Sequence, residues 1–142
     1  MARFFKIFTV LSLFVSLVSA CQNADDIGSL YGIWRLESIV TPQETLYPTG
    51  LYMSFEGKVV EAKHANQETH GYVSLFGMLT LDDNSVTMKF VEIDTGVVTK
   101  KSLLGEYFHF PLTDSFTVSM RQPNSRTLCF EADGMTWNLQ KY

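Results

Sequence analysis

The chain has 142 residues, of which 46% are hydrophobic and 18% are charged, and its formal net charge is −4. This length fits one domain with one core, and the composition excludes an intrinsically disordered chain. The acidic balance disfavours nucleic acid and anionic lipid headgroups as partners.

The first twenty residues have the layout of a targeting segment. Arg3 and Lys6 precede an apolar run over residues 7–18, and small residues follow it. This run has the length of a secretory signal core, and it is shorter than the about 20 residues that a bilayer-spanning helix needs. We therefore predict a signal peptide over residues 1–20, whose removal leaves the rest of the chain more acidic still.

The end of this segment carries a more specific pattern. Leu17-Val18-Ser19-Ala20-Cys21 resembles the lipobox of bacterial lipoproteins, which implies cleavage before Cys21 and diacylation of its thiol, for example with palmitate. The alternative is an ordinary signal peptide that ends near a cysteine. Because each buried methylene contributes about 0.8 kcal/mol, acyl chains on Cys21 would anchor the protein in the bacterial cell envelope, on the periplasmic or surface face of the outer membrane. Residues 21–29 are then an acylated N-terminus and a flexible tether.

The first stretch after this tether alternates with a period of two. In residues 30–40, Trp34, Leu36 and Val40 fall on one side, and charged side chains lie on the other. This pattern is typical of a strand with one buried face. Gly32 lies at its start, and a glycine lets the backbone approach whatever covers that end of the sheet, so that Trp34 can plug the floor of a closed structure.

These residues also carry a family resemblance. Gly32-Ile33-Trp34 resembles the Gly-x-Trp signature of lipocalins, in particular the short lipocalin-like domains of bacterial lipoproteins. The resemblance implies an up-and-down β-barrel that holds a small ligand, with the indole as a structural part of its closed end. In this family an arginine from a late strand often covers the indole. The candidate cations here are Arg121, Arg126 and Lys141.

The rest of the chain has the pattern of short strands joined by turns. Residues 41–50 are a loop, Gly77 indicates a bulge or bend, and Asp133-Gly134 is a strong signal for a two-residue hairpin turn. No helical pattern follows the signal segment. Alternating runs predict strands over residues 51–55, 58–64, 72–81, 86–91, 106–110, 116–121, 128–130 and 135–139, with a further one within 97–104.

Eight or nine short strands, with the last placed to pair with the first, predict an all-β domain over residues 30–142. The architecture is an up-and-down antiparallel β-barrel, lipocalin-like by the resemblance above, or a closely related sandwich. Closure of the sheet would remove the exposed edges that promote aggregation.

A ligand cup in such a barrel is lined by inward side chains near its open end. An eight-stranded barrel has room for its own side chains or for one small ligand, so a filled barrel and an open cup both remain possible. The candidate ligand-binding residues are Tyr52 (or its neighbour Met53), Tyr72, Phe76, Met88, Phe90, Phe108 and Met120.

The residue pattern gives no sign of a metal, a cofactor or a catalytic centre. His64, His70 and His109 lack the spacing of metal ligands. No serine lies in a nucleophile-elbow pattern, and there is no glycine-rich phosphate loop. Cys129 lies in an alternating run and is interpreted as a small, partly covered side chain. We therefore expect no metal, no cofactor and no catalytic residue.

Two functions fit these expectations. The first is a membrane-anchored lipoprotein whose barrel binds a small hydrophobic ligand at the cell envelope, for which a pocket of about 300 Å³ or more would be needed. The alternative is a packed barrel that acts through its outer surface on an envelope protein partner, as an assembly subunit or as an inhibitor of a hydrolase. An enzyme is the third hypothesis.

Overall fold

The computed structural model describes residues 27–90, 105–110 and 115–142. A short 3₁₀ helix, η1 (Gly28–Leu30), precedes the strands in this part of the chain. The strands are β1 (Gly32–Val40), β2 (Thr45–Leu46), β3 (Leu51–Glu56), β4 (Val59–Ala65), β5 (Tyr72–Asp82), β6 (Ser85–Phe90), β7 (Phe116–Asn124), β8 (Thr127–Ala132) and β9 (Met135–Lys141).

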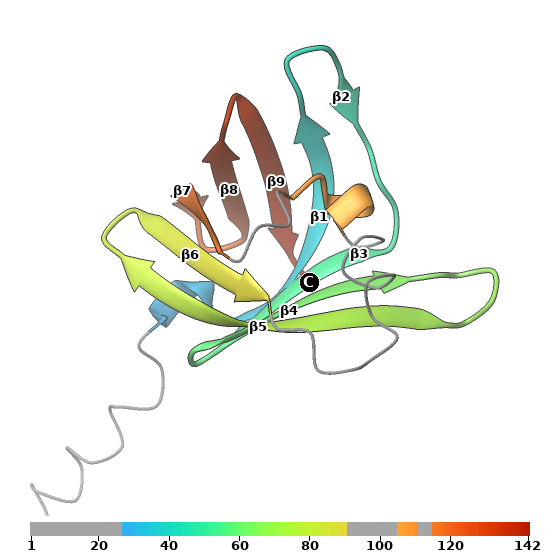
Figure 1. Ribbon diagram of the computed structural model, residues 1–142, viewed down its shortest axis with the longest axis horizontal. Helices are drawn as coiled ribbons and strands as arrows, with labels where there is room; N and C mark the ends of the chain where they lie inside the picture. Colours follow the sequence, from blue (N-terminus) through green and yellow to red (C-terminus); the bar gives the residue numbers. More distant parts are fainter. Residues whose placement is uncertain (1–26, 91–104, 111–114) are drawn as a thin grey trace, which may run out of the picture.

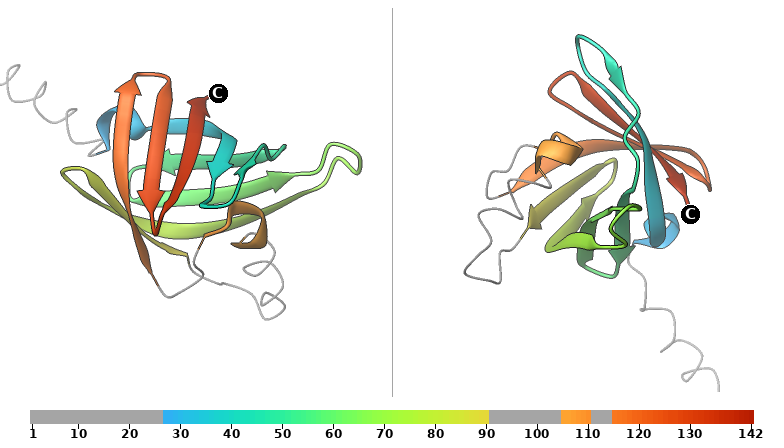
Figure 2. Two further views of the ribbon diagram at one scale, coloured as in Figure 1. Left: turned by 90° about the horizontal axis from the view of Figure 1, so that it is seen from above. Right: turned by 90° about the vertical axis from the view of Figure 1, so that its right-hand side faces the viewer.

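These strands form one antiparallel sheet that closes on itself. The order is β2-β1-β3-β4-β5-β6-β7-β8-β9, and β1 also pairs with β9 (Figure 1). The strands β1 and β3 to β9 therefore make an eight-stranded barrel, and β2 pairs with the far end of β1. Two further views show that β8 and β9 run steeply across β4 and β5 (Figure 2). The predicted all-β, up-and-down antiparallel barrel is confirmed, rather than the sandwich.

The hairpin turns follow the sequence signals closely. Asp133 and Gly134 connect β8 to β9 with φ angles of 50° and 76°. Two successive positive φ angles are what a type I′ turn requires, and this turn matches the twist of the strands that it joins. The predicted strand within residues 97–104 lies outside the described residues. No helix of the described residues is long and apolar enough to cross a bilayer.

The fold begins before residue 30. Ile27 immediately precedes η1 and Leu30 is its last residue, and both are buried in the hydrophobic core cluster. The prediction that residues 27–29 belong to a flexible tether is therefore wrong, because the apolar side chain of Ile27 holds them against the barrel. Residues 1–26, which include Cys21, lie outside the described part of the chain.

A bulge in β1 changes which residues face inward. Trp34 and Leu36 are buried as predicted, but Val40 is exposed and Ile39 is buried in its place. The pairing of β1 with β9 shifts in register between Leu36 and Ser38. An extra residue in one strand inverts the alternation beyond it, so the prediction for Val40 is wrong.

The two faces of β5 are also reversed from the prediction. Leu75 and Leu79 are buried, whereas Tyr72 is 66% exposed and Phe76 is 48% exposed. Both sets of alternating residues in this strand include large apolar side chains, so the alternation did not distinguish the inward face. The prediction that Tyr72 and Phe76 line the interior is wrong.

Gly77 lies on the inward face of β5. It pairs with Val60 of β4 and Phe90 of β6, and neither pairing shifts in register there, so the predicted bulge is absent. A Cβ atom at Gly77 would lie 2.6 Å from the carbonyl oxygen of Lys89. This close backbone approach requires glycine, and β5 continues in register with β6 to Asp82.

Residues 106–110 do not form the predicted strand. Residues 105–108 are helical, and His109 then takes a φ of 55°. Phe108 and Phe110 are both buried although they are two residues apart. Both rings are buried because the segment packs against the end of the barrel. The alternation of apolar and polar residues here therefore reflects contact with the core and not a strand.

Candidate functional site

Trp34 closes one end of the barrel, which we call the floor. Its side chain is fully buried, and its Nε1–H donates a hydrogen bond of 2.8 Å to the carbonyl oxygen of Leu30 in η1. A buried indole needs a partner for its N–H, and the helical turn provides one. The predicted burial of Trp34 is confirmed, and η1 covers this end of the core.

Gly32 and Lys141 complete the floor around this indole. The Nζ atom of Lys141 lies 5.2 Å from the centre of the Trp34 ring, so Lys141 is the covering cation among the three candidates. Gly32 has a φ of 122°, and a Cβ atom there would lie 3.1 Å from Cε of Lys141. The glycine is therefore needed both for its backbone conformation and for the passage of the lysine side chain. Arg121, by contrast, lies 3.7 Å from the carboxylate of Glu131.

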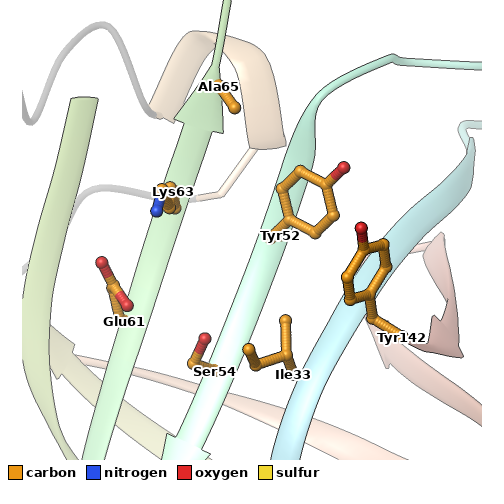
Figure 3. A pocket seen from close by; sticks show the side chains of 7 residues that line it. All are labelled: Ile33, Tyr52, Ser54, Glu61, Lys63, Ala65 and Tyr142. Carbon is orange, nitrogen blue, oxygen red and sulfur yellow. The ribbon is translucent and has the colours of Figure 1, made fainter. Parts of the chain in front are cut away.

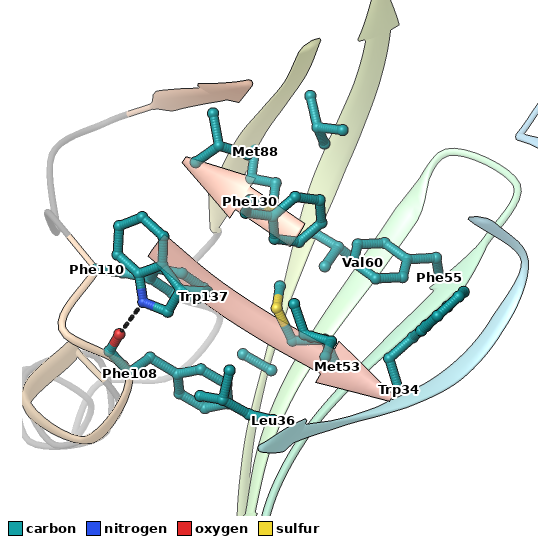
Figure 4. Close-up of a cluster of buried hydrophobic side chains, with 14 of the residues drawn as sticks. Trp34, Leu36, Met53, Phe55, Val60, Met88, Phe108, Phe110, Phe130 and Trp137 are labelled. Atoms are coloured by element: carbon teal, nitrogen blue, oxygen red, sulfur yellow. Dashed lines mark hydrogen bonds between the residues drawn. The ribbon is translucent and has the colours of Figure 1, made fainter. Parts of the chain in front are cut away.

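Trp137 marks the opposite end of the interior, which we call the mouth. Its ring is buried, and its Nε1–H donates a hydrogen bond of 2.6 Å to the carbonyl oxygen of Phe108 (Figure 4). Residues 105–110, which we call the mouth segment, thus cover this end as η1 covers the other. Each end of the barrel has a buried indole that binds the backbone of a short helical turn.

Aromatic rings fill the interior beneath the mouth segment. Phe110 lies at the centre of this cluster, with ring centres 5.1 Å from Phe108, 4.9 Å from Phe116 and 5.4 Å from Trp137. Phe90 packs on it from β6, with its ring centre 6.5 Å from that of Phe110. The side chains that meet here are apolar, so this part of the interior suits an apolar ligand rather than a charged one.

The predicted ligand-binding residues separate into two groups. Met88, Phe90 and Phe108 are buried, and Met120 is half-buried and packs against the core. Their role in binding stays a prediction. Phe110, Phe116 and Trp137 also lie in the aromatic cluster, and the ligand-cup prediction did not include them; the density of phenylalanines between residues 108 and 116 is the signal that could have identified the first two.

The other three predicted residues lie on the outer face of the sheet. Tyr72 and Phe76 point outward from β5, and Tyr52 is half-buried and points outward from β3, where its inward neighbour Met53 is buried. These residues do not line a common cup with the buried group. The prediction that Tyr52 faces the interior is wrong, because Tyr52 shares the outer face of β3 with Ser54 and Glu56. Its alternative, Met53, lies on the buried face.

Tyr52 instead lines a pocket on the outer face of the barrel. The pocket has a volume of about 240 Å³ and is open to solvent (Figure 3). Its residues are Ile33, Tyr52, Ser54, Glu61, Lys63, Ala65 and Tyr142. Near it, Glu37 accepts a hydrogen bond from Arg35, and this contact raises the pKa of the Arg35 guanidinium.

The histidines and Cys129 do not form a cluster in the described part of the chain. His64 packs its ring 4.2 Å from that of Tyr107 in the mouth segment. Within the described ranges, no group of three or more His, Cys, Asp or Glu side chains converges. Cys129 is buried, and its thiol lies 3.3 Å from Oδ1 of Asn138.

Comparison with known proteins agrees with this geometry. A search of curated proteins gives no match. An uncharacterized protein from Bacteroides eggerthii is 15% identical, with a TM-score of 0.67 over 80% of this chain and 99% of that chain. A lipocalin-like protein from Bacteroides uniformis is 18% identical, with a TM-score of 0.65 over 81% of this chain and 100% of that chain. These likenesses show the fold.

A family comparison goes further than the fold. The model of the lipocalin-like domain family matches residues 15–142, which includes every described strand. The Gly32-Ile33-Trp34 floor, with the Lys141 cation over the indole, gives this match a physical basis. The chain belongs to the lipocalin-like domain family.

Proposed function

We propose that this chain is a membrane-anchored lipoprotein of the cell envelope whose barrel binds a small hydrophobic ligand at the mouth. One observation carries the proposal of ligand binding. The mouth half of the interior is lined by aromatic side chains from the sheet and filled by Phe108 and Phe110 from a segment that is not part of the sheet. If the mouth segment moves outward, it vacates an apolar space large enough for a ring or a short chain.

The contacts that hold the mouth segment on the barrel are mostly apolar. Among the described residues, its hydrogen bond to the barrel wall is the one that Trp137 donates to the carbonyl oxygen of Phe108, and a bond of this kind contributes about 0.5–1.5 kcal/mol. An apolar ligand would replace the phenylalanine rings against Phe90 and Phe116, so most of the buried apolar area would be kept. The cost of the exchange is the exposure of the Phe108 and Phe110 rings, roughly 1.5–3 kcal/mol each, which the binding of the ligand has to offset.

The proposed lipid anchor lies in the chain just before the residues that cover the floor of the barrel. The stretch from Cys21 to Ile27 spans at most about 20 Å when fully extended, and Ile27 and η1 lie at the floor. An acylated Cys21 would thus keep the floor near the membrane, with the mouth on the far side. This orientation leaves the mouth accessible to a ligand from the surrounding aqueous phase or from a partner protein.

The test of ligand binding uses the two tryptophans as reporters. Titration with the apolar dye N-phenyl-1-naphthylamine should quench the emission of Trp137 at the mouth and leave that of Trp34 at the floor nearly unchanged. The Trp34→Phe variant should therefore keep the quenching, and the matched Trp137→Phe variant should lose it. Equal quenching in both variants would place the dye outside the mouth and contradict the proposal.

A packed barrel that acts through its outer surface is the second candidate. Val59 and Met78 pair across β4 and β5, and with Phe76 they form an exposed apolar patch on the outer face. Such patches often mark protein contacts. Replacement of all three by serine should then abolish association with an envelope protein partner and leave dye binding unchanged, which separates the two candidates.

A further inference from the structure

The pocket on the outer face is built on three neighbouring strands. Ile33, Ser54 and Glu61 lie side by side in β1, β3 and β4, because Ile33 pairs with Ser54 and Ser54 pairs with Glu61. Tyr52 and Lys63 form the next pair along the same strands. The side chains at these positions point to the same outer face, away from the core, so the pocket is separate from the proposed interior site (Figure 3).

One side of the pocket is an apolar wall. The rings of Tyr52 and Tyr142 meet edge to face, with centres 5.6 Å apart and planes at 86°. The backbone N–H of Tyr142 donates a hydrogen bond of 2.9 Å to the carbonyl oxygen of Ile33, which fixes the base of this residue. The side chain of Ile33, 48% exposed, adds aliphatic surface beside the rings. Such a wall suits the C–H face of a small ring.

The other side of the pocket is polar and uncommitted. Among the described residues, the Glu61 carboxylate and the Ser54 hydroxyl have no hydrogen-bond or ion partner. Lys63 directs its Nζ atom over the ring of Tyr72, 4.5 Å from its centre, and leaves its aliphatic stem beside the pocket. A carboxylate only accepts hydrogen bonds, and hydroxyls both donate and accept. A ligand with several hydroxyl groups can donate hydrogen bonds to the Glu61 carboxylate and exchange hydrogen bonds with the Ser54 hydroxyl.

The charges around the pocket select against ionic ligands. Tyr52 pairs with Arg35 of β1 and with Lys63 of β4. A cationic ligand on the Tyr52 ring would therefore lie between two basic residues, which disfavours its binding. The Glu61 carboxylate disfavours an anion. The volume of about 240 Å³ is below the roughly 300–1,000 Å³ of pockets for drug-sized ligands, so it holds a single ring.

We propose that the pocket over β1, β3 and β4 binds one neutral, polyhydroxylated ring of the size of a monosaccharide unit. Tyr52 and Tyr142 contact the C–H face of the ring. Glu61 and Ser54 accept and donate hydrogen bonds at its edge. The site does not depend on the interior ligand or on the anchor.

Saturation-transfer NMR with the full-length chain in a polyoxyethylene detergent tests this assignment. The probes are methyl β-D-glucopyranoside and methyl β-D-galactopyranoside. At least one should receive saturation at its ring C–H protons, and its affinity should fall at least about fivefold in Tyr52→Ala. Tyr142→Ala, which removes a side chain that is 76% exposed, should give a similar loss without risk to the fold.

The matched control is Tyr47→Ala, which removes another tyrosine that is 76% exposed but lies outside the pocket. It should bind the probe as the parent chain does. The proposal is overturned if neither glycoside receives saturation, or if the affinity is the same in Tyr52→Ala. Binding of tetramethylammonium in place of both glycosides, with loss in Glu61→Gln, would also overturn it and assign the pocket to organic cations.

Discussion

At the scale of single residues, the floor explains why the Gly-x-Trp pattern needs both of its members. The indole of Trp34 fills the end of the core and hydrogen-bonds to η1, and the side chain of Lys141 reaches its ring across the space that Gly32 leaves free. A cation over an indole contributes about 0.5–1 kcal/mol at exposed sites and more where it is desolvated. The motif is thus a packing arrangement of two side chains and the glycine that makes room for them.

Substitution of Gly32 tests this arrangement. Gly32→Ala should lower the free energy of unfolding by about 3 kcal/mol, because a side chain at a φ of 122° is strained and its Cβ meets Lys141. The control is Gly57→Ala in the β3–β4 turn, where φ is 56° and nothing lies within 4 Å. It should cost about 1 kcal/mol. Urea unfolding followed by tryptophan fluorescence measures both, and equal losses would show that Lys141 plays no part.

The sequence predicted the floor residues because a glycine and an indole at the head of a strand have few structural roles. The prediction failed at Tyr52 although Ser54 and Glu56 mark the same face of β3 as polar. It failed at Tyr72 and Phe76 because β5 carries large apolar residues on both faces. The choice between two apolar faces depends on register with the neighbouring strands. At Gly77 a Cβ atom would meet the backbone of Lys89, and a pattern within one strand does not reveal this contact.

At the scale of elements, the mouth segment is the clearest case of tertiary contact overriding local pattern. Its alternation of Phe108 and Phe110 with polar residues is typical of a strand, yet the segment is helical up to residue 108 and packs on the barrel end. The indole of Trp137 binds its backbone, and this pairing of distant residues is not visible in sequence. The bulge in β1 escaped prediction for the same reason.

Truncation of Phe108 should turn the filled mouth into an open one. Phe108→Ala should cost about 3–5 kcal/mol of stability, since it removes a fully buried ring, and it should increase the affinity for the apolar dye because space is vacated. The control is Glu106→Ala, an exposed position in the same turn. Calorimetric titration with the dye measures the effect. Unchanged or weaker dye binding in Phe108→Ala would show that the ring does not occupy the ligand space.

The proposed anchor depends on one side chain before the first described element. Cys21→Ser should abolish incorporation of radiolabelled palmitate by cells that express the chain, and it should move the mature protein from the membrane pellet to the soluble fraction. Cys129→Ser is the matched control, because Cys129 is the other cysteine of the chain and is buried. It should keep the label. Labelling that persists without Cys21 would contradict the lipobox interpretation.

At the scale of the whole molecule, most of the architecture could be predicted. Short alternating runs, turn signals such as Asp133-Gly134 and a last strand able to pair with the first lead directly to a closed barrel. The contents of that barrel could not be predicted, because they depend on how far the mouth segment enters it. The outer pocket was also missed, since it combines side chains from β1, β3 and β4 with Tyr142.

Native mass spectrometry of the mature protein, purified from the envelope in which it is made, tests the central claim that the barrel carries a small hydrophobic ligand at its mouth. The account predicts a mass above that of the acylated chain, with the excess released as a small apolar molecule on collisional activation. It also predicts that Trp137→Phe retains less of this molecule than Trp34→Phe does. A mass equal to that of the acylated chain alone, in the parent protein and both variants, would contradict the account.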